Sequence, residues 1–177
     1  MKFDLLHTEP VYQGRAFGVE RVQVRLPNGH ESVYDLVRHV GAVTLVPIDD
    51  DGRILFVRQY RLGADQVLLE LPAGVLDPGE PPAECAAREI REETGNAARE
   101  MLPLGTFYMA PGYSSEYMHV FLARGLYPAP LEADDDEFLQ VEAVDAAEAY
   151  AMVRRGELID GKSLAALLLA RPYINGI

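Results

Sequence analysis

The chain has 177 residues, which suits one domain with a small appended element, and 49% of them are hydrophobic, enough to bury a core. Its 28 acidic residues outnumber its 16 basic ones and give a formal net charge of −12, which argues against a nucleic-acid or membrane surface as partner. The single cysteine, Cys85, excludes an intrachain disulfide, and the N-terminus lacks a signal-peptide pattern, so we expect a cytoplasmic protein.

The first third of the chain predicts short strands joined by tight turns. Asn28-Gly29 between two alternating segments is a strong hairpin signal. A second hairpin is expected around the turn Asp49–Gly52, and a break at Pro72-Ala73-Gly74 follows the last of these strands. The segments expected as strands are Val11–Phe17, Val19–Leu26, Glu31–Arg38, Ala42–Ile48, Arg53–Gln59 and Val67–Leu71.

A helix is expected from about Pro81 to Thr94. Its prolines suit a first turn, its alanines and Ile90 fall on one face, and Gly95 supplies a stop. Strands and helices then interleave without a regular βαβ repeat, which predicts an α/β fold with a mixed sheet and helices on both faces. The later elements are expected as strands at Leu104–Met109, Tyr117–Ala123 and Phe138–Ala143 and as helices at Asp145–Arg155 and Lys162–Arg171.

The helix after Pro81 carries a crowded acidic face. Glu89 and Glu93 lie about 40° apart around the helix axis, one turn from each other. Glu92 lies beside them, and Arg88 is placed to pair with Glu92 at i,i+4. Adjacent glutamates repel one another unless a cation joins them, and their hard oxygen atoms suit Mg²⁺ or, in its place, Mn²⁺. A solvated acidic helix face is the alternative interpretation.

Residues Gly74 to Asn96 turn this face into a specific motif. They match the pattern G-x5-E-x7-R-E-U-x-E-E-x-G-U, where U is a bulky apolar residue, at every defined position except Asn96. The sequence therefore resembles the Nudix hydrolases. The departure at Asn96 puts local packing in doubt more than the chemistry of the helix.

Further motifs are similar to the ADP-ribose pyrophosphatase branch of that family. They are Arg58-Gln59-Tyr60-Arg61, Glu70-Leu71-Pro72-Ala73-Gly74, Pro111-Gly112-Tyr113-Ser114-Ser115-Glu116 and the acidic run Asp134-Asp135-Asp136-Glu137. The resemblance implies a Nudix-type α/β/α sandwich in residues 39–177, preceded by a small antiparallel β element in residues 1–38. It also implies an intertwined homodimer formed by that element, although the hairpin packing only on its own domain is the alternative.

The activity implied by the resemblance is Mg²⁺-dependent hydrolysis of the pyrophosphate bond of ADP-ribose, or of a related nucleoside-diphosphate sugar, to AMP and ribose 5-phosphate. Glu92 would act as base or would support the metal-binding carboxylates, with Arg88 holding it, and a simple helix ion pair is the alternative. Asp135 is the candidate general base, although a solvated acidic turn is the other interpretation of its loop. The implied metal ligands are the carbonyl of Ala73 and the carboxylates of Glu89, Glu93 and Glu137.

Substrate recognition is expected from residues outside the helix. The guanidinium of Arg61 suits a diphosphate or an adenine edge. Glu116 would orient the terminal ribose or the attacking water, unless it is an ordinary strand-edge charge. Phe17 would stack on adenine from a partner subunit, unless it is a core residue. Arg58 and Glu70 complete the implied substrate-binding set, although Arg58 has the alternative of bracketing its strand end.

Three other functions stay open from the sequence. The same chemistry acts on other nucleotides, such as GDP-mannose, a flavin dinucleotide or a diadenosine polyphosphate. A non-catalytic ADP-ribose-binding regulator has the same fold, but such sensors lose box glutamates that this chain keeps. An isoprenoid-diphosphate isomerase also has this fold, but we find no suitable cysteine–glutamate pairing outside the helix.

Overall fold

The computed structural model describes residues 2–132 and 138–174, which form two compact units. The first unit comprises Met1–Gly41 with Phe107–Tyr117, and the second comprises Ala42–Thr106 with Met118–Ile177. The division expected from the sequence, 1–38 and 39–177, stays a prediction. The structural units differ from it because the loop before Tyr117 belongs with the N-terminal strands.

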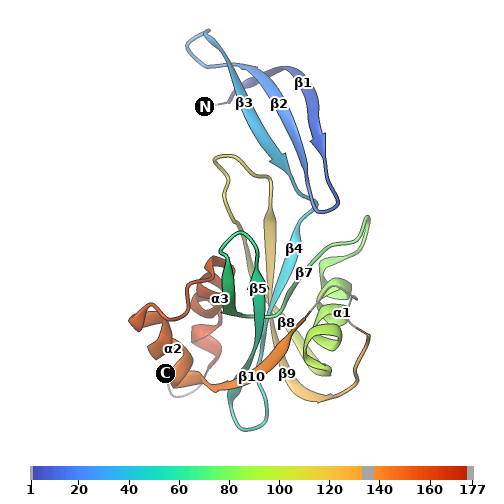
Figure 1. Cartoon of the computed structure of the whole chain (residues 1–177), viewed down its shortest axis with the longest axis vertical. Coiled ribbons are helices and arrows are strands. Elements are labelled where there is room, and N and C mark those ends of the chain that lie inside the picture. Colours follow the sequence, from blue (N-terminus) through green and yellow to red (C-terminus); the bar gives the residue numbers. More distant parts are fainter. Residues whose placement is uncertain (1, 133–137, 175–177) are drawn as a thin grey trace. The chain divides into compact units, whose positions relative to one another are not determined.

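The first unit is built on an antiparallel sheet of three strands. These are β1 (Asp4–Gln13), β2 (Gly18–Arg25) and β3 (Glu31–Arg38), in the order β1-β2-β3 (Figure 1). The expected hairpin joins β2 and β3, and Gly29 adopts the positive φ of 85° that its turn requires. The predicted bounds Val11–Phe17 were wrong, because the strand in the structure, β1, ends at Gln13. The chain then turns, and Gly14 N–H donates to the Phe17 carbonyl at 3.0 Å.

The loop of the first unit is fixed by the end of β3. Val37 N–H donates to the carbonyl of Tyr113 at 2.8 Å, and Ser115 N–H donates to the carbonyl of Val37 at 2.9 Å. The amide of His39 also donates to Ser115 Oγ at 3.0 Å. The motif Pro111–Glu116 is therefore held by the N-terminal strands.

The second unit contains a mixed sheet and a separate antiparallel sheet. In the mixed sheet, β4 (Ala42–Pro47) pairs antiparallel with β7 (Ala73–Val75) and parallel with β9 (Tyr117–Pro128), which neighbours β8 (Asn96–Tyr108). Every residue of β4 is buried, as a strand covered on both faces must be. The antiparallel sheet has the order β10-β5-β6, from β5 (Arg53–Arg61), β6 (Gln66–Glu70) and β10 (Gln140–Asp145).

Helices cover this second unit on two sides. In Figure 1, α1 (Pro82–Thr94) lies on one side of the strands, and α2 (Ala146–Arg155) and α3 (Gly161–Ala170) lie on the other. Helix α1 packs on β4 and β7, α3 packs on β4, and α2 packs on β5 and β10. A short 3-10 turn, Arg171–Tyr173, follows α3. The layers are those of an α/β/α sandwich with a mixed sheet, as expected from the sequence.

Several predicted bounds differ from the structure for local reasons. The expected break at Pro72-Ala73-Gly74 contains strand β7, because β4 offers its edge to Ala73 and Gly74. Strand β8 starts at Asn96 rather than Leu104. Its first half contains polar residues and Pro103, so the sequence there lacks the hydrophobic pattern by which a strand is predicted. Asp145 caps α2 from outside the helix by accepting from the amides of Ala147 and Glu148.

Candidate metal and substrate site

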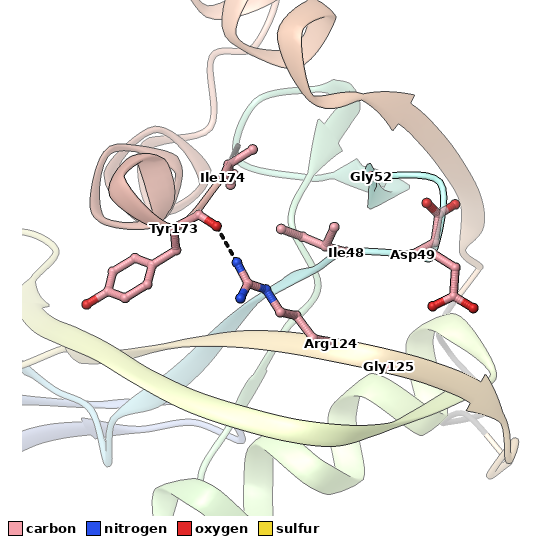
Figure 2. A pocket seen from close by; sticks show the side chains of 8 residues that line it. Ile48, Asp49, Gly52, Arg124, Gly125, Tyr173 and Ile174 are labelled. Atoms are coloured by element: carbon pink, nitrogen blue, oxygen red, sulfur yellow. Dashed lines mark hydrogen bonds between the residues drawn. The ribbon is translucent and has the colours of Figure 1, made fainter. Parts of the chain in front are cut away.

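A cavity lies at the turn between β4 and β5 (Figure 2). Its volume is about 370 Å³, and Arg124 crosses it to donate to the Tyr173 carbonyl. The carboxylate of Asp49 is already bonded to Arg53, with Nε to Oδ2 at 2.8 Å. The cavity is lined by Ile48, Asp49, Asp50, Gly52, Arg124, Gly125, Tyr173 and Ile174, none of which was predicted as a site residue.

Helix α1 buries the two glutamates that the motif singles out. It follows Pro81, carries Pro82 in its first turn, and ends at Gly95, whose φ of 72° is left-handed. Glu89 is 6% exposed and Glu93 is 4% exposed. Burying two carboxylates one turn apart costs free energy unless polar or cationic partners surround them. The solvated-face interpretation is therefore wrong for these two residues.

Arg88 is the cation that joins the acidic residues of α1. Its Nη1 donates to Glu89 Oε1 at 2.6 Å and to Glu92 Oε2 at 2.9 Å, so the expected pair with Glu92 is present. Its Nε and Nη2 bind both oxygens of Glu80 at 3.1 and 3.0 Å. These hydrogen bonds hold the pKa of Glu80 at about 2, and they raise the pKa of Arg88. Arg88 thus fixes the carboxylates of Glu80, Glu89 and Glu92 around one guanidinium.

Strand β7 lies directly against the buried carboxylates. The amide of Ala73 donates to Glu93 Oε2 at 2.9 Å. A Cβ atom placed on Gly74 would lie 1.8 Å from Glu89 Oε1, so only glycine leaves room for that carboxylate. The Pro72 carbonyl accepts from Leu45 N–H at 2.8 Å, which ties the same segment to β4. Ala73 and Gly74 of β7 therefore lie against the carboxylates of Glu93 and Glu89. We call this group of four residues the cradle.

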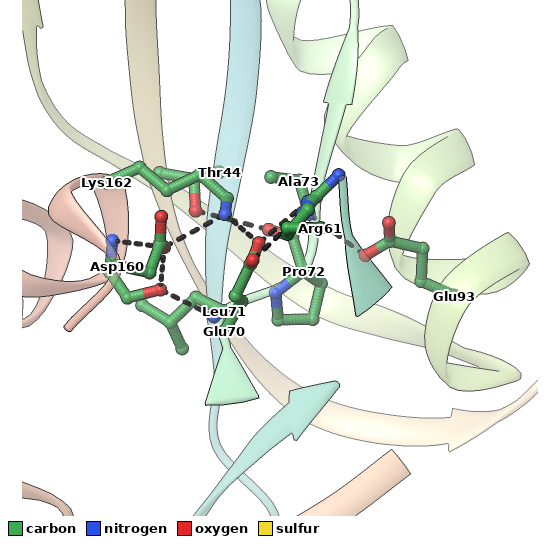
Figure 3. Close-up of polar contacts among 10 residues, drawn as sticks. Thr44, Arg61, Glu70, Leu71, Pro72, Ala73, Glu93, Asp160 and Lys162 are labelled. Carbon is green, nitrogen blue, oxygen red and sulfur yellow. Dashed lines mark hydrogen bonds and ion pairs between the residues drawn. The ribbon is translucent and has the colours of Figure 1, made fainter. Parts of the chain in front are cut away.

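A network of charged side chains surrounds Glu70, just before the segment Pro72–Gly74 (Figure 3). Arg61 binds Glu70 as a fork, with Nε to Oε1 at 2.9 Å and Nη2 to Oε2 at 2.7 Å. Glu70 is only 1% exposed, and it also pairs with Lys162, which binds Asp160 at 2.9 Å. Burial alone would raise the pKa of Glu70, but the hydrogen bonds from Arg61 and the charge of Lys162 together hold that pKa below its usual value.

Lys162 and Asp160 were not predicted as site residues. The signal was present in the sequence, since Lys162 is the one charged residue inside the apolar helix GKSLAALLLA, two residues after the capping aspartate. Its partner Glu70 is 92 residues away along the chain, so no local pattern connects the two.

The other predicted residues have different neighbours, belong to the first unit, or lie outside the described residues. Arg58 Nε pairs with Glu142 Oε2 at 2.5 Å across β5 and β10. Glu116 and Phe17 belong to the first unit, where Phe17 is exposed with its ring 6.3 Å from that of Tyr12. Asp135 and Glu137 lie outside the described residues.

The donor set of the cradle fits a hard divalent cation. Among residues 2–132 and 138–174, no three histidine, cysteine, aspartate or glutamate side chains are grouped as a metal site. Glu89 nevertheless offers its carboxylate oxygens where a Cβ on Gly74 would lie, and Glu93 offers its own beside the Ala73 amide; such oxygens are the ligands that Mg²⁺ prefers. The expected third carboxylate, Glu137, belongs to the part of the chain that the structure leaves undescribed.

Comparisons with known proteins agree with this arrangement. A family model described as "NUDIX domain" matches residues 38–167. An "ADP-ribose pyrophosphatase" of Bacillus subtilis (strain 168) is 37% identical over 161 residues, 90% of this chain and 87% of that protein. One of Mycobacterium tuberculosis is 38% identical over 177 residues, 98% of this chain and 86% of that protein.

The fold is similar to that of a solved structure, and the helices were also compared with what a membrane span requires. The structure described as "Crystal structure of ADP compounds hydrolase" matches with a TM-score of 0.87 at 32% identity, covering 99% of this chain and 96% of that one. Within the described part of the chain, every helix is too short or too polar to span a membrane.

Proposed function

Because the chain belongs to the NUDIX domain family, we propose that it hydrolyses the pyrophosphate bond of ADP-ribose, or of a related nucleoside-diphosphate sugar, with Mg²⁺. The observation that carries this proposal is the cradle at β7, where two buried glutamates lie against Gly74 and the amide of Ala73. The relatives named as ADP-ribose pyrophosphatases support the choice of substrate.

The residues of the cradle have distinct proposed tasks. Glu89 and Glu93 would hold Mg²⁺ together with the Ala73 carbonyl and with Glu137. Bound Mg²⁺ would neutralise the diphosphate charge and lower the pKa of the attacking water. Arg88 orients Glu92 through a bond of 2.9 Å, and Asp135 takes the proton of that water. Attack at phosphorus then separates AMP from ribose 5-phosphate.

Substrate contacts are proposed for a second group of residues. Arg61 binds the diphosphate through the part of its guanidinium that Glu70 leaves unused. Glu70 is too deeply buried to touch substrate, so its task is to hold Arg61. Glu116 orients the terminal ribose, Phe17 of a partner subunit stacks on adenine, and Arg58 contributes from β5.

A substrate panel tests the proposed activity. Purified protein with Mg²⁺ is expected to turn over ADP-ribose with the highest kcat/KM, and chromatography should detect AMP and ribose 5-phosphate in equal amounts. The panel also contains GDP-mannose, a flavin dinucleotide and a diadenosine polyphosphate, with chelator as the negative control. A higher kcat/KM for one of those three would favour the alternative substrate class. ADP-ribose that binds without turnover would favour a regulatory, non-catalytic protein.

We also propose a homodimer formed by the N-terminal sheet in a reducing compartment such as the cytoplasm, which suits the free Cys85. The sheet exposes several large apolar side chains, among them Leu5, Val11, Tyr12 and Val33. Sedimentation should give a species of twice 19.6 kDa. Leu5→Asp should dissociate it, whereas Leu168→Asp, at an equally exposed leucine of α3, should not. A wild-type protein that sediments only at 19.6 kDa would contradict the dimer.

A further inference from the structure

Lys162 is a buried cation for which the proposed reaction has no task. It is 8% exposed in the first turn of α3, and its ammonium group contacts Glu70 Oε2 and Asp160 Oδ2. Asp160 is also the cap of α3, accepting from the amide of Ser163 at 3.0 Å. A lysine is rarely buried unless its charge is paired, so this position is built around its ammonium group.

The same carboxylate oxygen joins Lys162 to Arg61. Glu70 Oε2 accepts from Arg61 Nη2 at 2.7 Å and from Lys162 Nζ, while Oε1 accepts from Arg61 Nε. The fork uses one edge of the guanidinium, so the protons on Nη1 face away from Glu70. The side chain of Arg61 is 40% exposed, whereas that of Glu70 is 1% and that of Lys162 is 10% exposed, so Arg61 is the member of the network that a ligand can reach.

We propose that Lys162 is a positioning residue, acting through Glu70, that holds the Arg61 guanidinium for binding the diphosphate of the substrate. This inference rests on the proposed function. Two cations, Arg61 and Lys162, balance two carboxylates, Glu70 and Asp160. Without Lys162, Arg61 is the one remaining countercharge in this set, so it is drawn toward the buried carboxylates and away from an anionic ligand.

The position of Arg61 relative to the cradle supports this task. The hydrogen bonds to Glu70 contribute most to the raised pKa of Arg61, and the charge of Glu93 adds a smaller contribution. Arg61 therefore lies within electrostatic range of the glutamate proposed to hold the metal. A guanidinium fixed on that side is suited to the diphosphate that the metal would also contact.

A double-mutant cycle tests the proposal in the full-length chain. Lys162→Met is expected to raise KM for ADP-ribose about tenfold and to leave kcat within about twofold, because it weakens binding in the ground state and the transition state alike. In an Arg61→Gln background, the same change should alter KM less than about twofold, since the residue through which it acts is gone. Lys162→Gln, which keeps a hydrogen-bond donor, provides a second variant if Lys162→Met folds poorly.

A control at the contact between α2 and α3 separates positioning from stability. Tyr150→Phe removes the hydrogen bond from Tyr150 to the Leu167 carbonyl of α3 without touching the network. It should lower the thermal midpoint and leave KM unchanged. A loss of active enzyme at unchanged KM in Lys162→Met, or an equal effect in both backgrounds of the cycle, would overturn the proposal.

A measurement of equilibrium binding tests the role of Lys162 separately from the proposed hydrolysis. The dissociation constant of ADP-ribose, measured by calorimetry in chelator, should rise about tenfold in Lys162→Met even where no turnover is possible. A wild type that binds ADP-ribose but does not hydrolyse it would contradict the proposed function alone. A wild type that does not bind ADP-ribose, or an unchanged dissociation constant in Lys162→Met, would contradict the role of Lys162.

Discussion

Glu93→Gln should lower kcat for pyrophosphate hydrolysis by about a thousandfold or more, the magnitude expected when charge stabilisation at the reacting phosphate is lost. The amide keeps the size of the carboxylate, and its oxygen can still accept from the Ala73 amide, which Glu93 binds at 2.9 Å. Because this contact survives, the variant should fold as the wild type does. Steady-state kinetics and circular dichroism measure the two expectations.

Glu84→Gln is the matched control for this change. Glu84 lies in the first turn of the same helix, but its side chain is exposed. We expect its kcat and KM to equal those of the wild type. Mg²⁺ should raise the thermal midpoint of the wild type and of Glu84→Gln, and should raise that of Glu93→Gln much less. Turnover that survives in Glu93→Gln would show that Glu93 is not a metal ligand.

Gly74→Ala should lower kcat/KM by about a hundredfold, a loss of about 2.7 kcal/mol in transition-state stabilisation. The added Cβ would lie 1.8 Å from Glu89 Oε1 and must displace that carboxylate from the cradle. The φ of Gly74 is outside the left-handed region, so alanine fits its backbone. We therefore expect most of the effect in catalysis and little in the free energy of unfolding.

Gly63→Ala tests whether the effect is specific to the cradle. A Cβ on Gly63 would meet no atom within 4 Å, and its φ is also outside the left-handed region. This variant should match the wild type in both kinetics and denaturant unfolding. Wild-type kcat/KM in Gly74→Ala would mean that Glu89 can leave the cradle without harm, which contradicts its role as ligand.

Local patterns were sufficient to predict the acidic helix and its surroundings. The spacing of Glu89 and Glu93, the prolines before the helix and the stop at Gly95 are properties of one short segment, and α1 has almost the bounds expected from them. The family resemblance and the α/β/α sandwich are likewise confirmed. The contact of Gly74 with Glu89 of α1 could be predicted because both belong to one short motif in the sequence.

The network around Glu70 could not be predicted in the same way. Glu70 and Lys162 meet only after the antiparallel sheet and α3 have packed, and no periodicity in the chain encodes a contact over 92 residues. The loop Pro111–Glu116 presents the same difficulty, because its partner is the end of β3. Contacts of this kind depend on tertiary packing rather than on local propensity.

The segment Glu70–Gly74 links the two helical layers of the second unit. The amide of Leu71 donates to Ser163 Oγ of α3 at 2.7 Å, and the amide of Ala73 donates to Glu93 of α1 at 2.9 Å. Two peptide bonds therefore separate a link to one helical layer from a link to the other. Extended chain spans at most about 3.3–3.6 Å per residue, so this short segment limits how far the two helical layers can separate while both bonds are kept. A movement of α1 away from α3 must therefore break one of these two hydrogen bonds or move the segment that follows Glu70.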